Sequence, residues 1–132
     1  MAKNKHISIG RLGEDVATTY LQNKGFDVFK RNFRQKCGEI DIIAQKDGVL
    51  HFVEVKSGSY TGDFPKDGTD TFRPEDHMHG QKRKRLARVI QVYLDGGGYS
   101  DDQDWTVDLL VVHINTVTKR AKVHTIENVL LE

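Results

Sequence analysis

The pair Asp47-Gly48, set between two alternating apolar runs, constrains the fold of this chain more than any other feature. Asp-Gly in that setting is the strongest short-range signal for a two-residue β-hairpin turn. The flanking runs 38–43 and 52–56 are therefore predicted to form two antiparallel strands. Counting outward from the turn then fixes which residues of the two strands face each other.

Four charged residues meet at the open end of this hairpin. The count puts Asp41 directly opposite Glu54, and Glu39 opposite Lys56, with all four side chains on one face. Opposed residues have Cβ atoms roughly 5 Å apart, so the two carboxylates repel each other unless a cation lies between them. The pattern indicates a metal-dependent phosphodiesterase site.

The alternative is an ordinary solvated strand end with a Glu-Lys pair worth about 0.2–1 kcal/mol. The apolar setting argues against it. Alternation puts Ile43 and Phe52 on the charged face and Ile40 with Ile42 on the other face, so both faces are apolar. Such a ribbon is typical of a covered central pair, where ionised groups are costly unless paired or bound to metal.

Hydrolysis of a phosphodiester requires an activated water and neutralisation of charge. We expect Asp41 and Glu54, together with the carbonyl of Val55, to hold Mg²⁺ or Mn²⁺, which prefer oxygen ligands. Lys56 could orient or deprotonate the water. We expect the carboxylates to keep Lys56 charged, which favours positioning. Glu14, in a predicted helix with glycines that allow close approach to a strand, is either a further site residue or an exposed first-turn acid.

Two groups of cations flank this site. Arg34 and Lys36 come just before the hairpin, and Lys82, Arg83 and Arg85 begin a later predicted helix. Cations at a helix N-terminus oppose the helix dipole, so contact with a phosphate backbone explains the second group better than a solvated face does.

The whole chain of 132 residues has the size of one domain, with a net charge of +1. The patterns predict helices at 8–24 and 81–94, and strands at 26–33, in the hairpin, at 105–114 and at 121–126, the last at an exposed edge. The order αβββαββ describes a mixed β-sheet flanked by helices, with a long mobile loop over 57–80. One cysteine and no apolar leader or membrane span suggest a cytoplasmic protein.

The ordered set of motifs resembles the YraN-like family of small bacterial proteins, which has the PD-(D/E)xK nuclease core and is similar to archaeal Holliday junction resolvases. The similarity lies in Gly13-Glu14, Asn32, the run 38–43 and the run 52–56. The resemblance implies a restriction-endonuclease-like α/β fold, a divalent metal, structured or branched DNA as substrate, and pairing as a homodimer. It assigns Glu14, Asp41, Glu54 and Lys56 to catalysis, and makes Lys82 a basic residue of the second helix.

The chain departs from the family pattern at several positions. Ile40 stands where the motif name has proline, Gly58 and Thr106 stand where arginine is common, and the loop after the hairpin is longer. The changes to Gly58 and Thr106 leave open a second hypothesis, a nucleic-acid-binding accessory module with a nuclease fold and little turnover. A third is a protein-interaction domain that uses the long loop and the strand at 121–126.

Overall fold

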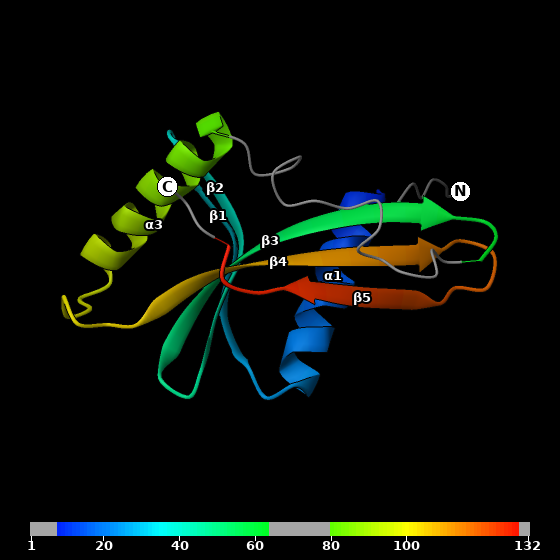
Figure 1. Ribbon diagram of the computed structural model, residues 1–132, viewed down its shortest axis with the longest axis horizontal. Coiled ribbons are helices and arrows are strands. Elements are labelled where there is room, and N and C mark those ends of the chain that lie inside the picture. The colour runs from blue at the N-terminus through cyan, green and yellow to red at the C-terminus, as the bar shows by residue number, and fades with distance from the viewer. Residues whose placement is uncertain (1–7, 64–79, 130–132) are drawn as a thin grey trace, which may run out of the picture.

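The computed structural model of the protein describes residues 8–63 and 80–129. It has an α/β fold, with a five-stranded mixed sheet flanked by two helices, as the sequence predicted. The elements are α1 (Ile9–Asn23), β1 (Asp27–Gln35), β2 (Gly38–Lys46), β3 (Val49–Tyr60), α3 (Gly80–Gly96), β4 (Trp105–Asn115) and β5 (Ala121–Ile126). Figure 1 shows α1 crossing behind β3, β4 and β5, whereas α3 lies beside β1 and β2.

The strand order in the sheet is β1-β2-β3-β4-β5, which places β5 at an edge as predicted. Only β3 and β4 are parallel; the other neighbours are antiparallel. The hairpin between β2 and β3 has the predicted register, because Lys46 pairs with Val49 next to the turn. Asp47 and Gly48 have φ angles of 52° and 80°, and two positive φ angles are what the tightest hairpin turn requires.

The direct opposition of charged residues across this hairpin was predicted wrongly. The β2–β3 ladder ends at the pair Ile42–Val53, one position before Asp41 and Glu54. Beyond that pair β2 continues against β1, and β3 continues against β4. The two strands therefore separate at the site, which opens space between the charged side chains.

The prediction that Ile40 shares a face with Ile42 is also wrong. Ile40 packs with Ile43 and residues of α3, whereas Ile42 packs with residues of α1. Asn32 of β1 lies between the paired residues Arg31 and Phe33, at the level of Asp41 in β2. Its φ angle is 53°. A left-handed residue interrupts the regular alternation of its own strand, so β1 is irregular beside the point where the β2 side chains change face.

Both helices follow their sequence signals. The Ser8 side chain accepts a hydrogen bond of 3.1 Å from the Arg11 amide and so caps α1, and Gly25 follows its end with a φ of 93°. The buried stripe of α1 includes Ala17 and Leu21. In α3 the buried residues are Leu86, Val89 and Ile90.

The predicted loop at 57–80 begins too early. Residues 57–60 belong to β3, where they pair with residues 112–115 at the end of β4. Residues 64–79 of the predicted loop lie outside the described residues. Neither described helix is long and apolar enough to cross a membrane.

Candidate active site

The predicted catalytic residues gather in a hollow of about 690 Å³, formed where α1 and α3 begin, β2 begins and β3 approaches its end. Its lining is Gly10, Glu14, Gly38, Glu39, Asp41, Glu54, Val55, Lys56, Ser57, Lys82, Arg85 and Leu86. All four residues assigned to catalysis, the three assigned to metal binding and two of the five assigned to nucleic acid are in this set.

Asp41 is the most shielded acid of the hollow, with 9% of its surface exposed. Its Oδ2 accepts a hydrogen bond of 2.8 Å from the Val55 amide, which fixes the carboxylate against β3. Burial, and after it the charge of Glu54, raise the pKa of Asp41 from 3.8 to about 7, although the Val55 hydrogen bond opposes the change. Without a bound cation, Asp41 therefore keeps its proton to a higher pH than an ordinary aspartate does.

Three carboxylates converge in front of β2. Oxygen atoms of Glu14, Glu39 and Asp41 all lie within 4.8 Å of one another. Glu39 was not among the predicted metal ligands, because the expected register paired it with Lys56; it instead lies opposite Arg34, with a 3.5 Å ion pair. The two-residue spacing of Glu39 and Asp41 was the sequence signal that could have identified it.

Arg31 of β1 contacts two acids of α1, Glu14 and Asp15. Arg31 was not among the site residues predicted from the sequence. Its Nη2 lies 2.8 Å from Asp15 Oδ1 and 3.7 Å from Glu14 Oε1. The guanidinium thereby joins the first turns of α1 to the sheet. No spacing rule connects the two positions, since the contact depends on how α1 crosses β1.

The helix approaches β3 most closely at Gly13, as expected for one of the two glycines. A Cβ added at Gly13 would lie 1.7 Å from Ser57 Oγ, whereas one at Gly10 would meet nothing within 4 Å. Only a residue without a side chain fits at Gly13. This contact sets the distance between Glu14 and the end of β3.

Glu54 and Lys56 are linked through the second helix. Lys82 Nζ lies 2.6 Å from Glu54 Oε2, and both side chains are largely shielded. Burial, and after it the neighbouring Lys82, lower the pKa of Lys56, although Glu54 and Asp41 act in the opposite direction. The expectation that the carboxylates dominate the pKa of Lys56 is therefore wrong, and the lowered pKa makes a role as a base more favourable.

The donor set fits a hard divalent cation. Carboxylates from α1, β2 and β3 supply the oxygen ligands that Mg²⁺ and Mn²⁺ prefer. Asp41 belongs to the group formed with Glu14 and Glu39, and it also interacts electrostatically with Glu54. A cation among them would remove the repulsion that raises the pKa of Asp41.

The basic residues divide between two adjoining hollows. Arg34, Lys36 and Arg85 line a second one of about 440 Å³, which shares Gly38 and Glu39 with the first. Lys82 lines the first, and Arg83 lines neither. Four of the five predicted nucleic-acid residues therefore border one continuous depression.

Comparison with known proteins identifies the family. Residues 13–125 match the description "Uncharacterised protein family UPF0102". The chain belongs to this family. This is the YraN-like family that the motifs indicated, so that recognition is confirmed.

Similar proteins cover nearly the whole chain. A UPF0102 protein of Campylobacter lari is 37% identical over 115 residues, which are 86% of this chain and 89% of the relative. One from Helicobacter pylori is 36% identical over 126 residues, covering 96% and 94%. One from Alkaliphilus oremlandii is 37% identical over 120 residues, covering 91% and 95%.

Two departures from the family pattern lie away from the lining of the hollow. Thr106 is at the other end of the sheet, where its hydroxyl donates to Asn128 Oδ1. Gly58 faces the ring of Tyr60 and is not a lining residue. Neither change alters the described walls around Asp41 and Glu54.

Proposed function

We propose that this protein is a divalent-metal-dependent endonuclease that hydrolyses phosphodiester bonds of DNA. The observation that supports this most is the buried Asp41 carboxyl, whose pKa of about 7 reflects burial and the neighbouring acids Glu54, Glu14 and Glu39. A group of acids that repel one another inside a protein is destabilising unless it binds a cation. Titratable groups whose pKa values are displaced in this way concentrate at functional sites.

Mg²⁺ or Mn²⁺ would be held by Asp41, Glu54 and the Val55 carbonyl, with Glu14 close enough to contribute. The bound ion would polarise the phosphate and lower the pKa of a water molecule. Lys56, with its lowered pKa, would take the proton of the attacking water. The water oxygen would bond to phosphorus as the bond to one sugar oxygen breaks, and that oxygen would take a proton from solvent water.

The substrate assignment rests on charge. Lys82 and Arg85 line the hollow beside the acids, and Arg34 and Lys36 extend the cationic border along the β1–β2 turn. Phosphates of a nucleic acid would bind this border, with an affinity that falls as salt rises. Branched or otherwise structured DNA and two copies acting as a dimer are finer parts of the proposal, carried over from the family resemblance. Action in the cytoplasm is a further part, and it is carried over from the single cysteine of the sequence.

A nucleic-acid-binding accessory module with little turnover is the second candidate. It was motivated by the missing arginines at Gly58 and Thr106. Since both positions lie outside the lining of the hollow, they give this candidate less support than the sequence suggested. Its distinguishing feature is salt-sensitive DNA binding without cleavage, whichever metal is present.

The test is cleavage of linear and four-way-branched DNA by the purified protein with Mg²⁺, Mn²⁺ or EDTA. Asp41→Asn is the key variant, since the amide keeps the acceptor for Val55 but removes the charge. Asp47→Asn is the matched control, because it makes the same change at the exposed hairpin tip. We expect metal-dependent cutting by wild type and Asp47→Asn, and none by Asp41→Asn, with DNA binding retained by all three.

Salt-sensitive binding without cutting under any metal would favour the accessory module. Equal cutting by Asp41→Asn and wild type would refute the proposed site. Sedimentation over a range of protein concentrations, with and without branched DNA, tests the dimer.

A further inference from the structure

Lys82 neutralises one of the proposed metal ligands in this structure. Its Nζ lies 2.6 Å from Glu54 Oε2, which is at least as short as a typical hydrogen bond between an ammonium and a carboxylate. Lys82 belongs to the first turn of α3, whereas Glu54 belongs to β3. The ion pair therefore connects the metal ligands to a helix that supplies none of them.

Glu54 is set apart from the other acids of the hollow. The carboxylates whose oxygen atoms all lie within 4.8 Å of one another are those of Glu14, Glu39 and Asp41. Glu54 lines the same hollow but does not belong to this group. An ammonium that already neutralises Glu54 lowers the gain from binding a second cation to it, so Lys82 and a metal ion compete for this carboxylate.

Lys82 is the partner that can leave this ion pair. Its side chain is 30% exposed, against 12% for that of Glu54. The flexible four-carbon stem of lysine allows the ammonium to turn toward another anion. Lys56 lies next to Lys82 and repels it when both are charged, which lowers the cost of this movement.

A phosphate of the substrate is the anion that would attract Lys82. Lys82 and Arg85 are three residues apart on α3 and line the same hollow, so one bound phosphate can contact both. The helix begins at Gly80, and the positive end of its dipole also favours an anion there.

We propose that Lys82 is a removable counter-ion of Glu54, which weakens metal binding until a DNA phosphate draws its ammonium away. The inference rests on the metal and phosphate binding of the proposed function and adds how the two are linked. Lys82 is a positioning residue in this scheme, because it acts through Glu54. DNA and the metal ion then bind cooperatively, and each raises the affinity for the other by the same factor.

The first test is calorimetric titration of the full chain with Mn²⁺ in the absence of DNA. We expect Lys82→Gln to bind Mn²⁺ about tenfold more tightly than the wild type, because a hydrogen bond between charged groups no longer competes. Lys82→Arg keeps the charge and should behave as the wild type. Circular dichroism checks the fold, and Lys82→Met replaces Lys82→Gln if the glutamine variant does not fold.

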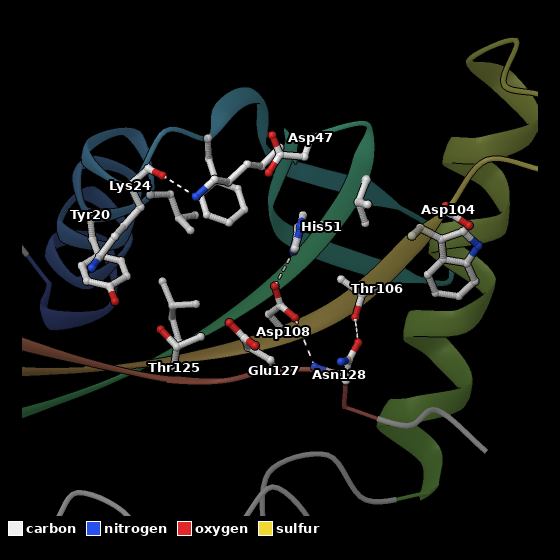
Figure 2. Close-up of a pocket in the computed structure, with 16 residues that line it drawn as sticks. Tyr20, Lys24, Asp47, His51, Asp104, Thr106, Asp108, Thr125, Glu127 and Asn128 are labelled. Atoms are coloured by element: carbon white, nitrogen blue, oxygen red, sulfur yellow. Dashed lines mark hydrogen bonds and ion pairs between the residues drawn. The ribbon is translucent and has the colours of Figure 1, made fainter.

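Two control substitutions also remove one positive charge each. Arg85→Gln does so in the same hollow, but Arg85 has no ion pair with an acid within 8–63 and 80–129. Lys46→Gln does so at the other end of β2, beside a separate hollow that Lys24 and His51 line (Figure 2). There Lys46 Nζ donates to the Lys24 carbonyl at 2.8 Å, so this lysine also has a partner to lose. Arg85→Gln should tighten Mn²⁺ binding much less than Lys82→Gln does, and Lys46→Gln should leave it unchanged.

The second test measures the cooperation between metal and DNA. Fluorescence anisotropy follows binding of a short DNA duplex with phosphorothioate linkages, which resist hydrolysis, in Mn²⁺ and in EDTA. The gain in DNA affinity from Mn²⁺ should be about tenfold larger for the wild type and Lys82→Arg than for Lys82→Gln, because only the first two carry the counter-ion that DNA removes. Asp41→Asn measures effects of Mn²⁺ that arise outside the site.

Equal Mn²⁺ affinity in the wild type and Lys82→Gln overturns this proposal, and so does an equal gain in Arg85→Gln or in Lys82→Arg. The proposed metal site stands in those cases if Asp41→Asn has lost Mn²⁺ binding. A gain in DNA affinity from Mn²⁺ that does not depend on Lys82 also overturns the proposal. Mn²⁺ binding by no variant refutes the metal site and the role of Lys82 together. Tighter Mn²⁺ binding and reduced cooperation in Lys82→Gln, without DNA cleavage by the wild type, would support the role of Lys82 and refute the endonuclease alone.

Discussion

Replacing Asp41 by asparagine is expected to make the metal-free protein more stable, although it removes a proposed ligand. The carboxyl is buried among other acids, and its pKa rises from 3.8 to about 7. Asparagine keeps an oxygen that can accept from the Val55 amide, as Asp41 does at 2.8 Å. The substitution therefore removes the charge and leaves the hydrogen bond.

The magnitude follows from the linkage between pKa and stability. The folded state binds the Asp41 proton more tightly than the unfolded state, so the stabilisation is complete below the unfolded pKa of 3.8 and lost as pH rises to about 7. At ~1.4 kcal/mol for each step of one in pKa, the full cost above neutral pH is ~4 kcal/mol. Between pH 5 and pH 8 the wild type should lose ~2–3 kcal/mol relative to Asp41→Asn.

The measurement is urea unfolding with EDTA, followed by circular dichroism, at several values from pH 5 to pH 8. The difference between wild type and Asp41→Asn should grow with pH and level off above neutral. Excess Mg²⁺ at pH 8 should stabilise the wild type and leave Asp41→Asn unchanged, because ligands that bind only the folded state add to its stability. Asp47→Asn, whose carboxylate is exposed, should follow the wild type at every pH.

Parallel pH curves for wild type and Asp41→Asn would refute this reasoning. A variant less stable than wild type at pH 8 would do the same, because the carboxylate would then be stabilising in its charged form. Either result would also weaken the case for a cation at this position.

Three further substitutions test other contacts of the site. Gly13→Ala should cost ~1–3 kcal/mol in urea unfolding, because its Cβ would lie 1.7 Å from Ser57 Oγ, and adding Ser57→Gly should restore most of the loss. Asn32→Val should cost ~1–2 kcal/mol in the same assay, whereas Asn32→Gly should be nearly neutral, because the φ of 53° suits glycine. Lys82→Gln should raise the pKa of Lys56, and should therefore move the acidic limb of the pH profile for cleavage to higher pH. An unchanged limb would argue against Lys56 as the base.

The sequence predicted the order of elements because the signals for these elements are local. The Asp47-Gly48 turn, the Ser8 cap and the periodic apolar positions each depend on residues close together in the chain. The strand at 121–126 was predicted with its observed bounds for the same reason. β3 was predicted too short because Ser57, Gly58 and Ser59 are typical of loops, whereas their pairing with β4 comes from a distant segment.

The candidate site was predictable where strand alternation determines it, and not where tertiary packing does. Counting along the hairpin brought Asp41 and Glu54 to one site, although the two are not a directly opposed pair. The contact of Arg31 with Glu14 and the ion pair of Lys82 with Glu54 depend on how the helices cross the sheet. The sign of the change in the pKa of Lys56 was missed for that reason, since burial and then the neighbouring ammonium of α3 lower it, and both come from tertiary packing.

The positions of the site residues along the chain affect how the protein folds. Glu14, Asp41, Glu54 and Lys56 all belong to the continuous segment from α1 to β3, whose strands pair with their neighbours in sequence. Lys82 and the rest of α3 come later, and β4 joins β3 only by a long-range parallel pairing. Since chains are synthesised from the N-terminus and local contacts form fastest, the acidic cluster should assemble before Lys82 and Arg85 of α3 emerge from the ribosome.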